Sequence, residues 1–244
     1  MSEIQGPVRG RRGRILLEGV VIVLSILLAF AIDAGWDERQ ERRAEQEILQ
    51  ALSAEFETYK EGFNDRAEFY DHMSESIVWL LDEAEFLPSE VERLDQALLA
   101  FVGVPTLETG SGVHAELVAS GRVSLISDLT LRRLVSTWQG LLAETTDNEV
   151  AVRQYATEVL IPYLASRGMP IGRASRIPRQ SDWRLAVASE AEALAAYRML
   201  VSDDEFRTLA TWRYEWALGS ARDFRWAAAT ADTALVRVRA SRGN

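Results

Sequence analysis

The hydrophobic positions of this chain follow a helical spacing, and the strict alternation typical of a β-strand appears nowhere. The most regular series begins at Leu49, where apolar residues recur every three or four positions and only Arg66 interrupts them. Such a period, kept over about five heptads, predicts a long helix in a left-handed bundle that ends before Pro88. The series comprises Leu49, Leu52, Phe56, Tyr59, Phe63, Tyr70, Met73, Ile77, Leu80 and Ala84.

Shorter helices are predicted in the middle of the chain. Ser89 and Glu92 have the spacing of a capping box, which predicts a helix that stops at Gly103. A loop follows to about residue 112. Residues 113–142 are predicted to form a short helix, a break at Gly121 and a second helix that starts near Asp128.

The next segments alternate between helix and loop. We expect a helix over residues 147–164, strained by Pro162, and another over residues 183–200. Between them, residues 168–181 hold three glycine or proline breaks and are predicted to be a loop.

The last helix is expected to start with a second capping box, Ser202 with Glu205, and to run to about Arg239. Small residues dominate its apolar stripe, and these permit close antiparallel packing against the long first helix. The stripe comprises Phe206, Ala210, Ala217, Phe224, Ala228, Ala231, Leu235 and Val238.

Residues 15–36 form a hydrophobic run whose only formal charges are Glu18 and Asp33. As a helix, the run reaches roughly 33 Å, about the thickness of a bilayer core. The alternative is a cleaved signal peptide, because Ala29-Phe30-Ala31 is an A-x-A pattern. Retention as a transmembrane helix is favoured because the run is long and ends at Trp36, a residue suited to the membrane interface.

Charges on both sides of this run predict its orientation. Residues 1–14 carry four arginines and one acid, which favours a cytoplasmic N-terminus and a periplasmic or extracytoplasmic domain at a bacterial inner membrane. Residues 37–47 lack large apolar side chains but favour a helix, so we expect a polar helical stalk. The expected organisation is a basic tail (1–14), a transmembrane helix (15–36), the stalk (37–47) and a helical-bundle domain (48–244).

One face of the predicted transmembrane helix gathers its polar and small residues, which usually mark contacts between helices in lipid. The alternative for Glu18 is an interfacial position with a partner in Arg14. We therefore expect this face either to pack on another transmembrane helix or merely to meet the interface. The face comprises Glu18, Ile22, Ser25, Ala29, Asp33 and Trp36.

Charge limits the other partners of the chain. The net charge is −10, and from Asp37 onward 23 basic residues stand against 34 acidic ones. A net charge of −11 repels nucleic acids, so we expect no nucleic acid among the partners. The absence of cysteine excludes disulfides and thiolate metal sites.

Candidate chemistry is sparse. Glu68, His72 and Glu75 are spaced along one side of the long helix as half a metal site, but no second Glu-x-x-His completes it, and a solvated polar face is the simpler interpretation. His114 stands without a recognisable catalytic context. We therefore predict neither an enzyme nor a cofactor.

Two further sets of residues are candidates for protein interfaces. Aromatic residues crowd the last helix, where the alternative is core filling, and arginines without acids occupy the loop at 168–181, where the alternative is simple solvation. The sets are Trp212, Tyr214, Trp216 and Trp226, and Arg173, Arg176 and Arg179.

Three segments resemble a bacterial family of uncharacterised single-span membrane proteins: LLEGVVIVLSILLAFAIDAGWDERQERRAEQEIL from Leu16, ELVASGRVSLISDLTLRRLVSTW from Glu116 and SDDEFRTLA from Ser202. The places that match the family's anchor are Glu18, Asp33, Trp36 and Glu38, whereas Ser25 stands where the family would have glycine. The resemblance implies an anchor followed by an all-helical domain and implies no activity.

These observations favour a membrane-anchored, non-enzymatic interaction protein. It would be an accessory or scaffold subunit of a larger inner-membrane complex, of a respiratory or light-harvesting type for example, or a homo-oligomer. The alternative is an extracytoplasmic ligand-sensing bundle that signals through a partner protein.

Overall fold

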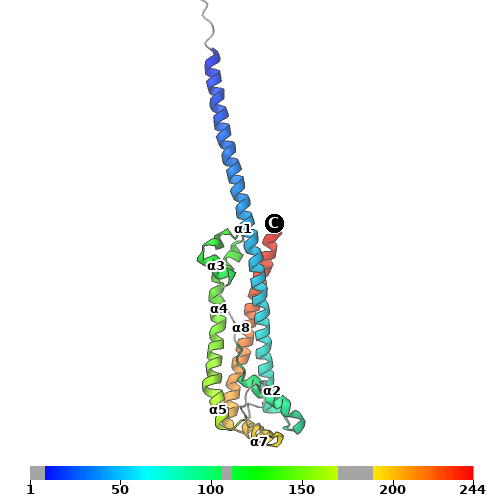
Figure 1. Cartoon of the computed structure of the whole chain (residues 1–244). Coiled ribbons are helices and arrows are strands. Elements are labelled where there is room, and N and C mark those ends of the chain that lie inside the picture. The colour runs from blue at the N-terminus through cyan, green and yellow to red at the C-terminus, as the bar shows by residue number, and fades with distance from the viewer. Residues whose placement is uncertain (1–8, 106–111, 170–188, 244) are drawn as a thin grey trace, which may run out of the picture.

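The computed structural model describes residues 9–105, 112–169 and 189–243, with side chains at position 21 and from position 23 onward. These residues form helices and connecting turns, and no strand occurs among them, which confirms the all-α prediction. The bundle has three long rods in Figure 1: α1 (Arg9–Val78), α8 (Asp204–Arg242), and α4 (Leu129–Tyr155) continued by η4 (Ala156–Leu160) and α5 (Ile161–Ser166). Shorter elements close the two ends of this bundle.

A single helix, α1, runs through the predicted hydrophobic run, the stalk and the start of the bundle. Its 70 residues correspond to about 105 Å. The N-terminal part projects alone beyond the bundle, whereas the C-terminal part packs beside α8 (Figure 1). Among the described residues, none of the helices combines the length and the apolarity needed to cross a bilayer.

The buried stripe of α1 keeps its spacing through the position where the sequence pattern showed a break. Ala67, 3% exposed, fills the step of the series at which the sequence has Arg66, so the buried stripe continues without a gap. Arg66 lies beside the stripe and pairs with Glu149 of α4 at 3.7 Å. A shift of one residue brings the small side chain inside and leaves the guanidinium at the edge of the core.

Close antiparallel packing of α8 against α1 is confirmed (Figure 1). The contact face of α8 is built largely from alanines, which let two backbones approach because a methyl group fills little space. The buried alanines of α8 are Ala210, Ala217, Ala221, Ala227, Ala228, Ala231 and Ala234.

The rod that contains α4 differs from its prediction in one respect. Asp128 caps the start of α4, as expected, by accepting from the backbone N–H groups of Thr130 and Leu131. The predicted boundary between two helices near residues 142–147 is wrong, because α4 continues through it. The strain expected at Pro162 is absorbed by the wider π-helical turn of η4, which removes the need for a proline N–H in an α-helical pattern.

Both predicted capping boxes are wrong. Ser89 lies inside η2 (Pro88–Glu90), and α2 (Val91–Val102) starts after Glu90 without a side-chain cap. At the last helix the cap is Asp203, which accepts from the N–H of Glu205, while Ser202 donates to the carbonyl of Met199. Asp203 has the extended backbone that an N-cap position favours, whereas Glu90 before α2 continues the 3-10 turn of η2.

The remaining elements cover the two ends of the bundle. α3 (Val113–Ala119) and η3 (Arg122–Leu125) lie at the end where α1 leaves, joined by Gly121 with a left-handed φ of 72°. α7 (Glu190–Val201) lies at the opposite end and starts with a capping box between Ser189 and Glu192 (Figure 1). The sequence pattern missed that box; residues 183–188 of the predicted helix are outside the described residues.

Candidate functional sites

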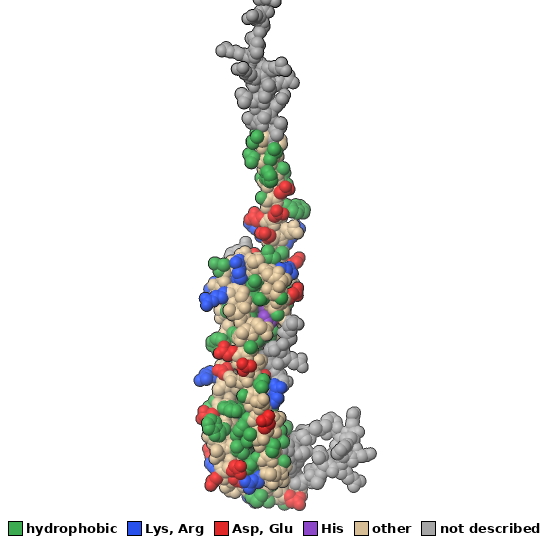
Figure 2. Space-filling view, turned by 90° about the vertical axis from the view of Figure 1, so that its left-hand side faces the viewer, with side chains coloured by type: hydrophobic (Ala, Val, Ile, Leu, Met, Phe, Trp, Pro, Cys, Tyr) green, Lys and Arg blue, Asp and Glu red, His purple; other side chains and the backbone are tan. Residues whose placement is uncertain are grey.

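The projecting part of α1 exposes an apolar surface that no other described part of the chain covers. Its large hydrophobic side chains are between 50% and 67% exposed, and they surround the helix rather than form a stripe. Figure 2 shows these hydrophobic side chains and the charged side chains of the stalk that follow them. The exposed residues are Val21, Val23, Leu24, Ile26, Leu27, Leu28, Phe30, Ile32 and Trp36.

Within this segment, Ser25, Ala29, Asp33 and Trp36 of the predicted partner face are all exposed. The hydroxyl of Ser25 donates to the carbonyl of Val21 at 2.8 Å, so it is satisfied inside its own helix. The side chains of Glu18 and Ile22 lie outside the described residues. The role of this face as a contact surface stays a prediction.

The four aromatic residues proposed for the last helix divide into two pairs. Trp212 and Trp226 are 58% and 56% exposed, whereas Tyr214 and Trp216 pack partly against the core. Trp216 meets the ring of Tyr155 edge-on, with 5.0 Å between centroids. Core filling therefore accounts for one pair, and an interface role stays a prediction for Trp212 and Trp226. Arg173, Arg176 and Arg179 lie outside the described residues.

The three residues of the possible half metal site do not all line the same pocket. His72 and Glu75 line a pocket of about 620 Å³ between the end of α1 and α2, and Glu68 is not among the residues that line it. Arg93 of α2 reaches the same pocket and stacks over the ring of Trp79 at 3.9 Å. Among the described residues, no group of three or more His, Asp or Glu side chains is arranged to hold a metal ion.

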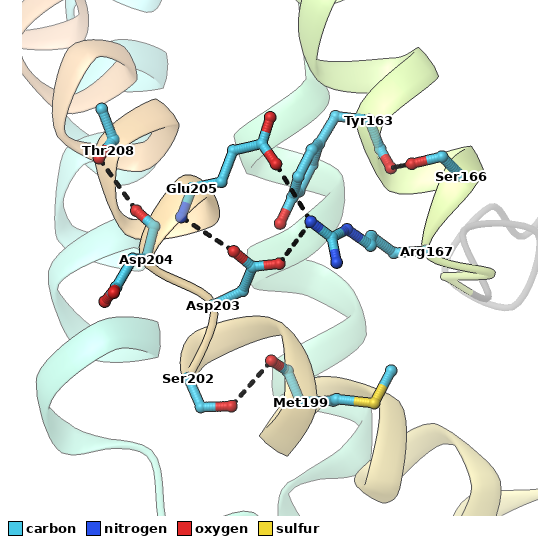
Figure 3. Close-up of polar contacts among 9 residues, drawn as sticks. All are labelled: Tyr163, Ser166, Arg167, Met199, Ser202, Asp203, Asp204, Glu205 and Thr208. Carbon is cyan, nitrogen blue, oxygen red and sulfur yellow. Dashed lines mark hydrogen bonds and ion pairs between the residues drawn. The ribbon is translucent and has the colours of Figure 1, made fainter.

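Ion pairs fasten the end of the bundle that lies far from the projecting segment (Figure 3). Arg167, just after α5, contacts Asp203 at 2.8 Å and Glu205 at 3.1 Å, and its guanidinium lies 5.1 Å from the ring centroid of Tyr163. Burial raises the pKa of Asp203, but the hydrogen bond from the Glu205 backbone, Tyr163 and the Arg167 charge lower it further, so the net shift is downward. The same carboxylate thus caps α8 and joins it to α5.

A buried arginine, which the sequence analysis did not single out, lies between α8, α4 and the end of α2. Arg213 of α8 is fully buried, and its Nε donates to the carbonyl of Phe101 at 3.0 Å. Its two terminal nitrogens donate to the carbonyls of Gly103 and Val152. Since the last carbonyls of α2 have no partner within their own helix, the guanidinium supplies donors where the helix end needs them.

Further titratable groups surround Arg213. Burial lowers the pKa of Arg213 to about 10, although the nearby Tyr70 and Tyr155 oppose the shift. Burial, followed by the charge of Glu149, raises the pKa of Tyr70 to about 12. Glu149 is 2% exposed and pairs with Arg66, so a charged pair and a buried guanidinium share one layer of the core. We call Arg66, Tyr70, Glu149 and Arg213 the Arg213 cluster.

A second buried polar group lies nearer to the projecting segment. His114 of α3 is 1% exposed; its Nδ1 lies 2.9 Å from Oε1 of Glu55 in α1, and its Nε2 lies 3.1 Å from Oε1 of Gln139 in α4. The backbone N–H of His114 also donates to Oε2 of Glu55 at 3.0 Å. We call Glu55, His114 and Gln139 the His114 cluster. It joins three elements that are far apart in the sequence.

The pockets described at the surface of the bundle are open and lined largely by polar and charged residues. They lack the apolar, enclosed lining typical of small-molecule sites. These pockets of the described residues therefore give the ligand-sensing alternative no support.

No protein-family model, no curated protein and no solved structure matches this chain. The resemblance to the family of single-span membrane proteins therefore stays a prediction.

Proposed function

We propose that this protein is a membrane-anchored, non-enzymatic helical interaction protein, an accessory or scaffold subunit of a larger inner-membrane complex or of a homo-oligomer. The observation that carries this proposal is the projecting part of α1, with large hydrophobic side chains at least half exposed on all sides. A helix that is apolar all round is stable when lipid or protein surrounds it. Residues 15–36 are the proposed anchor, with the N-terminus in the cytoplasm and the bundle on the periplasmic side.

Energetics favour an apolar environment for this segment. Burying one large aliphatic or aromatic side chain is worth about 1.5–3 kcal/mol, so the exposed set represents a large unused stabilisation in water. A continuous helix also satisfies its backbone groups internally, as a bilayer requires. Described side chains cover only positions 21 and 23–36 of the proposed anchor.

The ends of the segment fit an interface. Trp36 stands where the apolar side chains stop, and the charged stalk begins directly after it with Asp37. Within the stalk, Arg42 and Glu38 form an ion pair one turn apart, which supports the helix, and Glu45 accepts hydrogen bonds from Ser127 of the bundle. In this proposal the first part of the stalk separates the bundle from the bilayer, and its last part is fastened to the bundle.

Single-cysteine crosslinking tests the partner face, because the natural chain has no cysteine. Ser25→Cys and Ala29→Cys place the probe on the polar face, and Val23→Cys and Leu27→Cys are matched controls on the same turns. We expect crosslinks to another membrane protein, or to a second copy, from the first pair at several times the yield of the second. Equal yields from both pairs would exclude a specific contact face.

Anchoring and orientation need a separate test. We expect the full chain to remain in the membrane fraction after an alkaline wash, and the bundle to be digested when protease is added to spheroplasts. Release of the chain by the wash would contradict the anchor, whereas protection of the bundle in spheroplasts would reverse the orientation.

A further inference from the structure

The contacts of the His114 cluster depend on the protonation state of the imidazole. Its imidazole is enclosed between two oxygen atoms on two helices, Glu55 Oε1 and Gln139 Oε1. With the Gln139 amide turned so that its oxygen faces the ring, both partners of the imidazole can only accept hydrogen bonds, so both ring nitrogens donate. Only the imidazolium form carries protons on both nitrogens.

The position of the cluster gives this protonation a structural effect. α3 and η3 cover the end of the bundle from which α1 projects (Figure 1), and Leu117 and Ile126 of this covering segment are buried in the core. Gly112, just before α3, passes so close to the Glu55 carboxylate that an added Cβ would lie 1.6 Å from Oε1. Ser127 binds Glu45 of α1 through its N–H and hydroxyl at 2.6 and 2.9 Å, so the far end of the cover is fastened separately.

We propose that His114 is a protonation-dependent lock, which in its imidazolium form holds α3 to both α1 and α4 and which loosens this hold when the proton is lost. Deprotonation leaves one ring nitrogen as an acceptor against an oxygen, so one of the two links fails or Gln139 must turn its amide. The charge attraction to Glu55 disappears at the same time. The lock is independent of the proposed membrane anchor because its three residues all belong to the bundle.

The surrounding groups determine the direction of the pH response. Burial lowers the pKa of His114, but the hydrogen bonds to Glu55 and Gln139 and the charge of Glu55 raise it more, so the net shift is upward. Tyr59 of α1 also faces the imidazole, with 6.0 Å between centroids, and burial followed by the Glu55 charge raises its pKa to about 12, so it stays neutral. A histidine pKa raised by folding contributes stability that is complete below about pH 6.5 and is lost as pH rises through the folded-state value.

Hydrogen exchange of the full-length protein in mild detergent tests the lock. Protection of the amides in residues 113–126, corrected for intrinsic exchange, is compared between about pH 6 and about pH 9. We expect protection in the natural chain to fall by about tenfold for each unit by which folding raises the pKa. His114→Gln removes this fall. His72→Gln, which changes the only other histidine of the chain, an exposed one, keeps it.

A further variant moves the transition rather than removing it. Gln139→Glu places a second carboxylate opposite Nε2, so the loss of protection shifts to higher pH. The proposal is overturned if the natural chain and His114→Gln show the same pH response. It is also overturned if protection in the natural chain does not change with pH. Should His114→Gln fail to fold, nitrogen NMR of the natural chain decides at about pH 7.5, above the ordinary histidine pKa of about 6.5: both ring nitrogens protonated support the lock, and one protonated nitrogen contradicts it.

Discussion

The two parts of α1 belong to one continuous helix, yet they meet opposite surroundings. Within the bundle, most large apolar side chains lie in one stripe from Ile48 to Leu80, where they are at most 9% exposed, whereas Val78 beside this stripe is 38% exposed. In the projecting part, apolar side chains surround the helix and are at least half exposed. The comparison shows that the stripe packs against other helices of this chain, whereas the apolar surface of the projecting part makes no contact within the bundle. Substitutions in the two parts should therefore differ in what they change.

The largest effect is expected from Trp138 of α4, which fills the space between α4 and the embedded part of α1. Its ring meets Phe56 edge-on at 4.8 Å and is 1% exposed. Trp138→Ala should lower the free energy of unfolding by about 3–5 kcal/mol because it removes a large buried side chain and leaves a cavity. Chemical denaturation followed by circular dichroism measures the change. Trp212→Ala is the control, and a similar loss in both variants would contradict the assignment of Trp138 to the core.

A somewhat smaller effect is expected at the buried guanidinium. Arg213→Met keeps much of the volume but removes the donors to the carbonyls of Phe101, Gly103 and Val152, so we expect a loss of about 2–3 kcal/mol. Arg222→Met, at a guanidinium with 82% exposure, should change stability by less than about 0.5 kcal/mol. Unchanged stability in Arg213→Met would mean that these carbonyls find water instead.

The seam between α1 and α8 allows a test of close packing. Ala231→Leu adds three carbons at a fully buried position of α8 and should cost about 1–3 kcal/mol through overpacking. Ala229→Leu adds the same atoms two residues earlier, at an exposed position, and should be nearly neutral. Equal midpoints in a denaturant titration of the two variants would show that the seam has spare room.

The smallest effect on stability is expected in the projecting part of α1. Leu24→Ser combined with Leu28→Ser should change the unfolding free energy of the bundle by less than about 0.5 kcal/mol, because neither side chain contacts it. The same pair should weaken retention in the membrane fraction, measured after an alkaline wash. Leu52→Ser, in the embedded part, should do the reverse: it should destabilise the bundle and leave retention unchanged. A loss of bundle stability from the first pair would break the comparison between the two parts.

The three-and-four spacing of apolar residues also indicated two core positions that hold charged residues and that the sequence analysis did not interpret. In α8 the apolar positions Phe206, Ala210 and Ala217 leave Arg213 at the next step of the same three-and-four spacing, and the structure buries it there. In α4 the same spacing runs from Leu142 to Glu149, which is buried as well. A charged residue at a core position of a helical period is thus a usable signal for a buried polar cluster.

Other features had no such signal. Both capping boxes have the correct residue spacing, yet the caps form elsewhere, because capping depends on the backbone angles of a single residue and several neighbours compete for that position. His114 and Glu55 are 59 residues apart, and nothing in either local sequence indicates that they meet.

The amino-acid sequence by itself determined that this protein is all-helical, that most inward positions of α1 and α8 follow a three-and-four spacing, and that residues 15–36 are mainly apolar, with only Glu18 and Asp33 charged. These properties are local, since they follow from the side-chain period of a helix and from backbone sterics. Only the tertiary structure decided which groups meet across the core: Arg213 with the end of α2, and His114 with α1 and α4 at once. A period reports the face on which a residue lies but not the partner opposite, because partners come from packing of segments far apart in the chain.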